Sequence, residues 1–402
     1  MQTELIRQAA QDCAPAMNRF LRDLIRIPGE GQQEESAVAR ICEEMRRLGF
    51  DRVWTDRLGN ALGSVGSGDK ILAFDGHVDT VGIGDRSAWS FDPYEGFEDD
   101  VWIGGRGSSD QRGGIVASVY GAKIMKELGL IPDGYQILVV GSVQEEECEG
   151  LNWQCIVQEE HIRPELVVLT EPTDGNIYRG HRGRMDIIVE VGGRSAHGST
   201  PEKGVNAISR MSQIVGELDA LNERLKTDAF LGKGTLTVTQ IFYGGASRCA
   251  IPDSCTISID RRLTAGEDGL SALDEIRSLP SVRAYHAEVR ADSYARPSWK
   301  GHVHPVICYF PAWTVEESAP VCRAMEQAVR AVAGPARIDK WLFSTNGVSI
   351  MGRFGIPCIG YGPGLEGQAH APDEKMPKAD LVRCAAAYAA FPAAYQAVCA
   401  QR

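Results

Sequence analysis

Four consecutive hydrophobic residues occur at three places in the first half of the chain, at 71–74, 137–140 and 166–169. Unbroken runs of this length are typical of strands that are buried on both faces of a parallel sheet. Further short strands are expected at 52–55 and 61–65. Segments with helical spacing of apolar residues surround these strands, at 3–26, 33–48, 113–129 and 151–160. The alternation predicts an α/β domain with a mostly parallel sheet flanked by helices.

The pattern changes after about residue 182. Residues 184–191 alternate between apolar and polar, which indicates a half-exposed strand. The elements expected after it are a helix at 203–225, strands at 234–242 and 254–262, a helix at 267–279 and a strand near 284–291. This β-α-β-β-α-β order predicts a ferredoxin-like α+β module.

The α/β pattern returns after Pro297-Ser298-Trp299, which we interpret as a linker. A helix is expected at 319–333, strands at 338–343 and 358–361, and a terminal helix at 378–399. We therefore predict one domain formed by 1–181 and 295–402, with 182–294 inserted into it. The segment 82–109 has no clear period, and loops this long in a compact domain are usually functional.

Composition and charge narrow the class of protein. The 402 residues are 43% hydrophobic and 24% charged, and the net charge is -12. This balance argues against a nucleic-acid or anionic-membrane partner. Charged residues interrupt the first 25 positions, so we expect no signal peptide, and no stretch approaches a membrane span. The eleven cysteines form no CxxC pair, which favours reduced thiols and a cytoplasmic location.

Acidic and imidazole residues follow the predicted strands, where open α/β sheets place their sites. Five of them are candidate metal ligands: His77, Asp110, Glu146, Glu171 and His370. Mixed histidine and carboxylate ligands suit zinc, or manganese and cobalt in related geometry. Two metals that share five ligands need one bridging carboxylate, and such sites activate water for hydrolysis. A neighbouring free carboxylate can serve as the general base.

These residues stand in a familiar set of motifs. In order they are Gly76-His77-Val78-Asp79-Thr80, Gly107-Ser108-Ser109-Asp110-Gln111-Arg112-Gly113-Gly114, Glu145-Glu146, Glu171-Pro172-Thr173 and the late His370. The set resembles the di-zinc metallopeptidase family of aminoacylases, glutamate carboxypeptidases, acetylornithine deacetylases and succinyl-diaminopimelate desuccinylases. Within this family the sequence is most similar to the bacterial YgeY-like branch, around Gln144-Glu145-Glu146, Arg248-Cys249-Ala250 and Ser344-Thr345-Asn346-Gly347-Val348. Members of this branch are labelled as hydrolases or peptidases with a proposed link to selenium metabolism.

The resemblance implies two divalent metal ions, zinc above cobalt or manganese. His77, Asp110 and Glu171 would hold one ion, and Asp110, Glu146 and His370 the other, with Asp110 bridging. Asp79 would orient His77, and Glu145 would be the general base. His197 on the inserted module, which would serve as a dimerisation and lid domain, would reach the partner's site in a homodimer and stabilise the oxyanion. Arg262 would bind a substrate carboxylate.

Three positions depart from the family pattern. Cys249 stands where an asparagine is usual, Thr345-Asn346-Gly347 replaces a late T-D-A, and Gln111-Arg112 follows Asp110. None of these changes removes an expected ligand or the base. They fall where the family shapes substrate recognition, so we include Asn346 as a substrate-binding candidate.

The leading hypothesis is a cytoplasmic metal-dependent hydrolase that cleaves a dipeptide, an N-acyl amino acid or a related small amide with a two-metal-activated water. One alternative is a ureido or cyclic amide hydrolase in nitrogen scavenging, which differs only in the pocket. Another is a metal-dependent binding protein without turnover, against which the retained Glu145 and His197 argue. His302 and His304 lie two apart with no third ligand evident nearby in the sequence, so we expect no separate metal site there.

Overall fold

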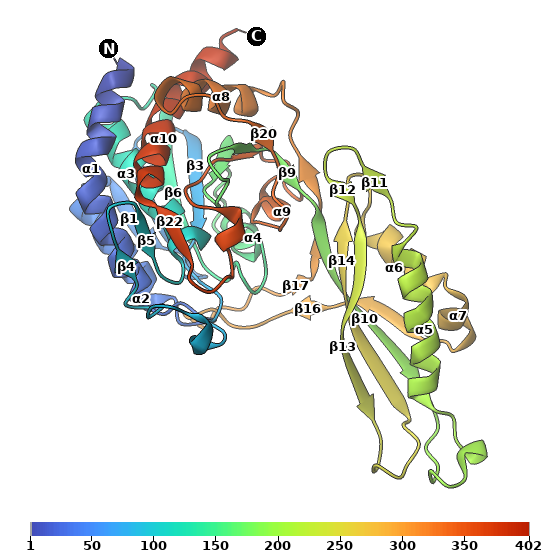
Figure 1. Cartoon of the computed structure of the whole chain (residues 1–402). Helices are drawn as coiled ribbons and strands as arrows, with labels where there is room; N and C mark the ends of the chain where they lie inside the picture. Colours follow the sequence, from blue (N-terminus) through green and yellow to red (C-terminus); the bar gives the residue numbers. More distant parts are fainter. Residues whose placement is uncertain (1, 402) are drawn as a thin grey trace.

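Two separate hydrophobic cores divide the chain, as the computed structural model of residues 2–401 shows. One core joins residues from both ends of the sequence, and the other contains buried residues between Met185 and Val289. The second group is the inserted ferredoxin-like module predicted above, here called the inserted domain, and the first is the larger domain (Figure 1).

The larger domain is built on an eight-stranded sheet with the strand order β1-β2-β6-β3-β7-β21-β8-β20. Its strands are β1 (Arg52–Thr55), β2 (Ala61–Gly66), β3 (Lys70–His77), β6 (Tyr135–Ser142), β7 (Leu166–Leu169), β8 (Ile177–Tyr178), β20 (Ile338–Asp339) and β21 (Cys358–Gly360). The four central strands β6, β3, β7 and β21 run parallel. Outside them the pairs β1–β2, β2–β6 and β21–β8 are antiparallel, and the edge pair β8–β20 is parallel. The three hydrophobic runs are β3, β6 and β7, so the mixed, centrally parallel sheet agrees with the predicted fold class.

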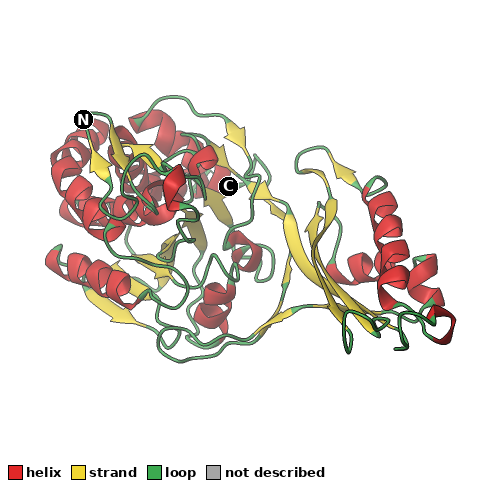
Figure 2. Cartoon of the chain, turned by 60° about the horizontal axis from the view of Figure 1, so that its bottom comes forward, coloured by secondary structure: helices red, strands yellow, loops and turns green. Residues whose placement is uncertain are grey.

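Helices flank this sheet (Figure 2). Helices α1 (Gln2–Ile25), α3 (Gly113–Glu127), α8 (Pro320–Val332) and α10 (Lys378–Cys399) pack against one another, and α2 (Glu35–Arg47) packs on β1 and β2. Helix α4 (Leu151–Gln158) contacts the short α9 (Gly347–Ile350). Because the central strands are parallel, their carboxyl ends and the loops that follow meet at one edge of the sheet.

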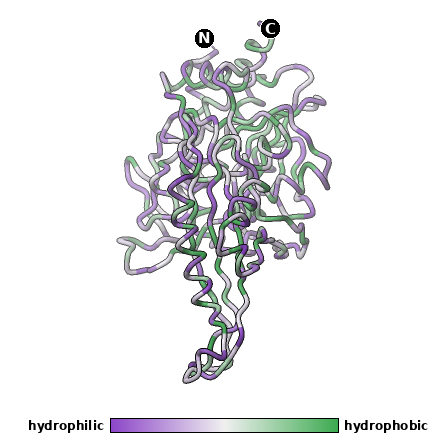
Figure 3. Tube along the Cα trace, turned by 90° about the vertical axis from the view of Figure 1, so that its right-hand side faces the viewer, coloured by the Kyte–Doolittle hydropathy of each residue, from purple (hydrophilic) through white to green (hydrophobic). Residues whose placement is uncertain are grey.

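The inserted domain is built on a five-stranded antiparallel sheet with helices on one face (Figure 2). Its strands β10 (Gly183–Gly192), β13 (Thr235–Gly244), β14 (Ser254–Leu263) and β15 (Glu288–Ala291) have the order β13-β14-β10-β15, and its helices are α5 (Ala207–Asn222), α6 (Gly269–Arg277) and α7 (Pro280–Ala284). The fifth strand, β18 (Tyr309–Phe310), comes from the chain after the return linker and pairs with β10. Residues along β14 alternate between buried and half-exposed, because only one face of this sheet carries helices. Hydrophilic and hydrophobic residues accordingly mix along this narrow domain in Figure 3.

Short elements connect these layers. They are β4 (Phe97–Glu98), β5 (Trp102–Gly104), β9 (Gly180–His181), β11 (Thr227–Asp228), β12 (Gly232–Lys233), β16 (Ser293–Tyr294), β17 (Val306–Ile307), β18 (Tyr309–Phe310), β19 (Trp313–Thr314), β22 (Lys375–Pro377), and the helical turns η1 (Arg86–Ala88), η2 (Ser108–Arg112), η3 (Pro201–Lys203) and η4 (Glu366–Gln368). Part of the aperiodic segment 82–109 forms β4 and β5, which pair with β22 in a small sheet.

Three expected elements differ from the structure. The helix expected at 203–225 begins only at Ala207, because the Asn206 side chain accepts a hydrogen bond from the backbone N–H of Ser209 and caps it there. The strand expected near 284–291 is shortened by α7, which starts at Pro280. The strand expected at 338–343 ends at Asp339, after which the indole of Trp341 donates a hydrogen bond to the Pro172 carbonyl.

All eleven cysteines are free thiols. Among residues 2–401, no helix is long and apolar enough to cross a membrane.

Candidate active site

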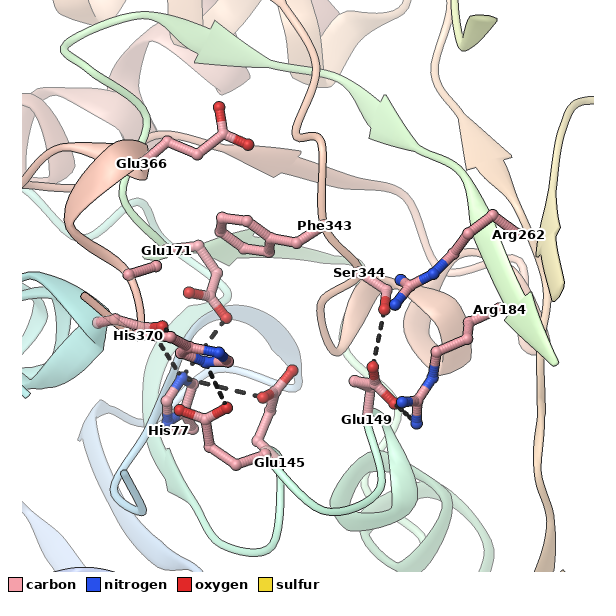
Figure 4. Close-up of a pocket in the computed structure, with 13 residues that line it drawn as sticks. His77, Glu145, Glu149, Glu171, Arg184, Arg262, Phe343, Ser344, Glu366 and His370 are labelled. Atoms are coloured by element: carbon pink, nitrogen blue, oxygen red, sulfur yellow. Dashed lines mark hydrogen bonds and ion pairs between the residues drawn. The ribbon is translucent and has the colours of Figure 1, made fainter. Parts of the chain in front are cut away.

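The loops that follow the central strands bring the predicted ligands to one cavity. His77 ends β3, Glu145 and Glu146 follow β6, Glu171 follows β7, and the loop after β21 carries His370. With Asp110, which precedes α3, these residues line a cavity of about 370 Å³ (Figure 4). A cavity of this volume fits a small molecule rather than a folded protein.

His77 lies at the centre of the cluster. Its Nε2 atom is 2.9 Å from Asp110 Oδ1, 3.8 Å from Glu171 Oε1 and 3.9 Å from Glu145 Oε2. Ligand atoms of His77, Asp110 and Glu146 lie within 4.8 Å of one another, and so do those of His77, Glu145 and Glu171. The two groups overlap at His77, whose Nε2 atom can bind only one ion, so two neighbouring ions would need one of the carboxylates as a bridge.

His370 closes the cluster from the opposite side. Its Nε2 atom lies 2.9 Å from Glu146 Oε2 and 3.4 Å from Asp110 Oδ2. Asp110 therefore contacts His77 through one oxygen and His370 through the other, as the bridging role would require. His370 and Gln144, the residue before Glu145, have left-handed φ values of 59° and 58°. Non-glycine residues rarely adopt this conformation, and at functional sites it redirects the neighbouring side chains.

Asp79 orients the imidazole of His77 through a contact with its Nδ1 atom. The Nδ1 atom of His77 lies 2.9 Å from the backbone carbonyl of Asp79 and 3.7 Å from its carboxylate. Because a carbonyl only accepts, Nδ1 carries a proton, and Nε2 is therefore the nitrogen that would bind a metal. The other carboxylate oxygen of Asp79 accepts a hydrogen bond from the backbone N–H of Glu146 and so fixes the loop that follows β6.

A buried carboxylate that the sequence analysis missed, Glu374, holds the loop that carries Asp110. It accepts hydrogen bonds from the backbone N–H groups of Gly107, Ser109 and Asp110 at 2.8 to 3.0 Å, and it pairs with Arg106 at 2.7 Å. No motif surrounds Glu374 in the sequence, and only the approach of β22 to β5 brings it to this loop.

A glycine allows the loop after β21 to approach the Glu171 loop closely. A Cβ atom on Gly362 would lie 2.1 Å from the carbonyl oxygen of Thr170 and 2.2 Å from that of Glu171. Neither backbone oxygen can move without displacing the β7 end. Only glycine therefore fits where this loop passes the Glu171 loop on its way to His370.

The electrostatics of the cavity call for cations. Burial and the neighbouring carboxylates raise the pKa of Glu145 and of Glu171 well above the usual glutamate value. Burial opposes protonation of His77, but Glu171, Asp110 and Glu145 outweigh it and raise its pKa. One oxygen each of Asp79, Glu145, Glu146 and Glu171 is buried without a hydrogen-bond partner among the described residues. Buried carboxylates without partners are costly, so this donor set fits bound divalent cations.

The outer wall of the cavity comes from the inserted domain and from the segment after β20. Arg184 and Arg262 enter from β10 and β14 (Figure 4). Arg184 pairs with Glu149 at 2.7 Å, and Glu149 also accepts a hydrogen bond from the hydroxyl of Ser344. Arg262 pairs through two nitrogens with Asp260 of the same strand. Of these residues the sequence analysis singled out only Arg262, because Arg184 and Glu149 lie outside the recognisable motifs.

Besides Asp79, which contacts His77 without lining the cavity, two predicted site residues lie outside it. Asn346 is buried, where its side chain donates to Asp75 and Ser142 and accepts from the backbone N–H of Gly150. It braces β3, β6 and the loop before α4 from behind, so substrate contact by Asn346 stays a prediction that this position does not favour. His197 is exposed in the connection from β10 to α5. Figure 1 shows this connection at the end of the inserted domain far from the larger domain. Within one protomer His197 does not reach the cavity.

Comparisons with known proteins agree with this geometry. Residues 73–394 match the peptidase family M20/M25/M40. The chain is 56% identical over 395 residues to the uncharacterized protein YgeY of Escherichia coli K12, covering 98% of each chain. It is 28% identical over 397 residues to the succinyl-diaminopimelate desuccinylase of Gluconacetobacter diazotrophicus, covering 94% of this chain and 96% of the relative.

Solved structures share the fold. An M20 family metallo-carboxypeptidase from Sulfolobus solfataricus superposes with a TM-score of 0.73 at 15% identity, over 93% of this chain and 98% of the other. The Bacillus subtilis YXEP protein, described as a dinuclear metal-binding M20 peptidase, superposes with a TM-score of 0.69 at 12% identity, over 96% and 99% of the two chains.

Proposed function

The chain belongs to peptidase family M20/M25/M40 and is a metal-dependent amidohydrolase or peptidase, and from this premise we propose that it cleaves an amide bond in a small substrate with Glu145 as general base. The observation that carries the proposal is the position of Glu145, whose carboxylate lies 3.9 Å from His77 within the group that it forms with Glu171. A pure binding protein has no use for an additional buried, partnerless carboxylate beside its ligands.

Two divalent ions fit the donor set described above. His77, Asp110 and Glu171 would hold one, and Asp110, Glu146 and His370 the other. When bound, such ions supply electrophilic activation of the amide carbonyl and of a water molecule. Zinc is our first choice because imidazole and carboxylate ligands in a closed protein cage suit it, with cobalt or manganese as substitutes.

Glu145 handles the proton in this proposal. Its carboxylate accepts a proton from the attacking water as the carbon–oxygen bond forms, and it donates that proton to the amide nitrogen as the carbon–nitrogen bond breaks. The left-handed backbone conformation of Gln144 directs the next residue, Glu145, into the cavity. The side-chain amide of Gln144 donates a hydrogen bond of 2.9 Å to the hydroxyl of Tyr294, which fixes this turn. Protein atoms surround the carboxylate, so it acts away from bulk water.

The arginines on the outer wall indicate a substrate with a carboxylate. Arg262 is half-buried at the wall, and its guanidinium reaches the cavity while its other edge pairs with Asp260. A guanidinium presents a planar fork that matches a carboxylate. The metal-binding groups and Arg262 lie on opposite sides of the cavity (Figure 4). A dipeptide or an N-acyl amino acid could place its amide at the first and its carboxylate at the second.

A second copy of the chain would complete the site. The exposed His197 lies at the far end of the inserted domain, and the edge strand β13 exposes Ile241, Phe242 and Tyr243 by 59%, 57% and 68%. Three adjacent exposed hydrophobic residues on an unpaired strand edge are typical of an association surface. We propose a homodimer in which this edge is covered and His197 enters the partner's cavity to stabilise the oxyanion.

The test is metal content together with turnover. The purified chain is stripped with a chelator, reloaded with zinc, cobalt or manganese, and assayed on a panel of dipeptides, N-acyl amino acids and ureido compounds. We expect near two active-site ions per chain and metal-dependent cleavage of at least one amide. Ureido cleavage alone would move the substrate class to that alternative, and full metal loading without any cleavage would support the binding-protein reading.

A further inference from the structure

A second group of metal-ligating side chains lies outside the cavity. Ligand atoms of Cys155, Glu159 and His302 lie within 4.8 Å of one another. His302 Nε2 is 3.0 Å from Glu159 Oε2, and Nδ1 of His304 is 2.5 Å from the other oxygen, Glu159 Oε1. None of these residues belongs to the ligand set of the active site. No metal site was predicted at His302 and His304, because Cys155 and Glu159 lie about 145 positions away along the chain.

The fold fixes this cluster from two sides. Cys155 and Glu159 are one helical turn apart at the end of α4 and so share a face. The histidines lie on residues 295–305, the linker that returns from the inserted domain to β17. Trp299 donates a hydrogen bond to the Gly59 carbonyl at 3.1 Å, and the ammonium of Lys300 donates to the Asp56 carbonyl at 2.7 Å. The linker is therefore held in place without any contribution from the histidines.

One nitrogen of the group makes no well-oriented hydrogen bond, and two of its side chains are reachable from solvent. The Nε2 atom of His302 is buried and makes no well-oriented hydrogen bond within residues 2–401. Cys155 is fully buried, whereas the side chains of His302 and Glu159 are 28% and 21% exposed, which leaves an entry path for an ion. The guanidinium of Arg57 lies 3.5 Å from Glu159 but also pairs with Glu160 at 3.0 Å, so it can stay on Glu160 when Glu159 binds an ion.

We propose that Cys155, Glu159 and His302 form a three-ligand transition-metal site, with zinc as its ion. A thiolate, an imidazole and a carboxylate suit zinc, whereas magnesium and calcium require all-oxygen ligands. His304 holds Glu159 through its second oxygen and thereby orients the ligand. The competing state is an ion pair between Glu159 and two protonated histidines, which needs no metal and no cysteine.

Such an ion would join two parts that serve the active site. Helix α4 directly follows the loop that carries Glu145 and Glu146, and the linker begins after Tyr294. The hydroxyl of Tyr294 donates a hydrogen bond of 2.5 Å to Glu147 and accepts one from the side-chain amide of Gln144. Tying the linker to α4 would stabilise the junction between the two domains next to the general base. Metal binding to the folded state alone raises its stability.

Cobalt absorption distinguishes this site from the active site, because only this site contains a thiolate. The metal-free protein is titrated with Co²⁺ and followed by near-ultraviolet absorption and bound-metal analysis. We expect about one ion per chain beyond those of the active site, together with a sulfur-to-cobalt charge-transfer band. Added zinc should displace the cobalt and abolish the band, and reloading the metal-free protein with zinc should raise its melting temperature.

Variants fix the assignment. C155S and H302A should each abolish the band and the additional ion, while C322S, which alters another fully buried free cysteine of the larger domain, should keep both. H302A changes a partly exposed linker residue, so it tests the site even if C155S unfolds. D110N should leave the band in place although it empties the active site, so failure of the proposed function and failure of this site give different results. A wild-type protein that binds Co²⁺ without a thiolate band would overturn the proposal.

Discussion

The Nε2 atom of His77 lies 2.9 Å from Oδ1 of Asp110, although the two residues are 33 positions apart and belong to different elements. Asp110 Oδ2 in turn lies 3.4 Å from His370, so this one carboxylate links the two histidines of the cavity. The loop that carries it is held by Glu374 through three backbone hydrogen bonds. Asp110 is therefore the residue on which both proposed metal positions depend.

Replacement of Asp110 by asparagine should remove both active-site ions. An amide offers one neutral oxygen where the carboxylate offers two charged ones, so neither position keeps its full ligand set. We expect affinity at both positions to fall by about 100-fold or more, since even outer ligand partners contribute 10- to 100-fold. Metal analysis after dialysis checks this, with D99N in an exposed turn as the control. Loss of only one ion from D110N would show that Asp110 does not bridge.

Replacement of Arg262 by alanine should weaken binding of substrates that carry a free carboxylate. A hydrogen bond to a charged group contributes about 1.5–3 kcal/mol, which corresponds to roughly a 10- to 100-fold rise in KM. The turnover number should change little, because Arg262 lies across the cavity from the proposed general base (Figure 4). Steady-state kinetics on paired substrates with free and amidated carboxylates measure the effect. R290A, an exposed arginine on β15, is the control, and an equal loss for both substrates would exclude carboxylate recognition.

His197 and Glu145 should complement each other across a dimer. H197A and E145Q homodimers should both be nearly inactive, because each site lacks one of the two groups. Subunits mixed and allowed to exchange should recover up to about a quarter of wild-type activity, since half of the dimers are then mixed and each has one complete site. Activity of the mixture is compared with that of each variant alone. No recovery after proven subunit exchange, or full activity of a dilute monomer, would contradict the role in trans.

Glu44 should make stability depend on pH at the acidic end. It is buried and bonds to Arg40 at 2.9 Å, to Arg47 and to the hydroxyl of Tyr120 at 2.6 Å. Burial opposes ionisation of Glu44, but these partners outweigh it and lower its pKa below 4.5. The folded state therefore prefers the charged form more than the unfolded state does. The stabilisation is present above the unfolded pKa and is lost as pH falls through the lower folded value.

E44Q should accordingly lower the free energy of unfolding by about 2–3 kcal/mol at neutral pH. The difference from wild type should narrow as pH falls below 4.5, because wild-type Glu44 then becomes protonated too. Urea unfolding at several pH values measures both. E43Q, which changes the neighbouring 74%-exposed glutamate, should alter stability by less than about 0.5 kcal/mol. A pH-independent difference for E44Q would contradict this account.

Much of the architecture could be predicted from the sequence because it depends on local patterns. The hydrophobic runs of β3, β6 and β7 mark buried strands wherever they occur, and the terminal helix at 378–399 has the bounds expected from its spacing. The acidic and imidazole residues after these strands converge because parallel strands end at the same edge. The division of the chain at 182 and 295 stays a prediction, although the two cores are separate.

What the sequence could not predict depends on contacts between distant segments. Asn346 was expected near substrate, but its environment is set by Asp75 and Ser142, more than 200 residues away. Glu374 and Arg184 carry no local signal, since nothing in their neighbours shows that they face the Asp110 loop or the cavity. The cluster of Cys155 and His302 exists only because the return linker lies against α4. The physiological metal, the substrate and the cytoplasmic location remain predictions.

The central claim is that Glu145 moves the proton while other residues hold the metal, and E145Q tests it most directly. The amide keeps the shape of the side chain but cannot accept the proton from water. With wild-type and E145Q protein loaded with the same metal, we predict equal active-site metal content and a fall in kcat of about 10²- to 10⁴-fold on the best substrate of the panel. Near-normal turnover by metal-loaded E145Q would contradict the proposed mechanism, and loss of metal from E145Q would make Glu145 a ligand instead.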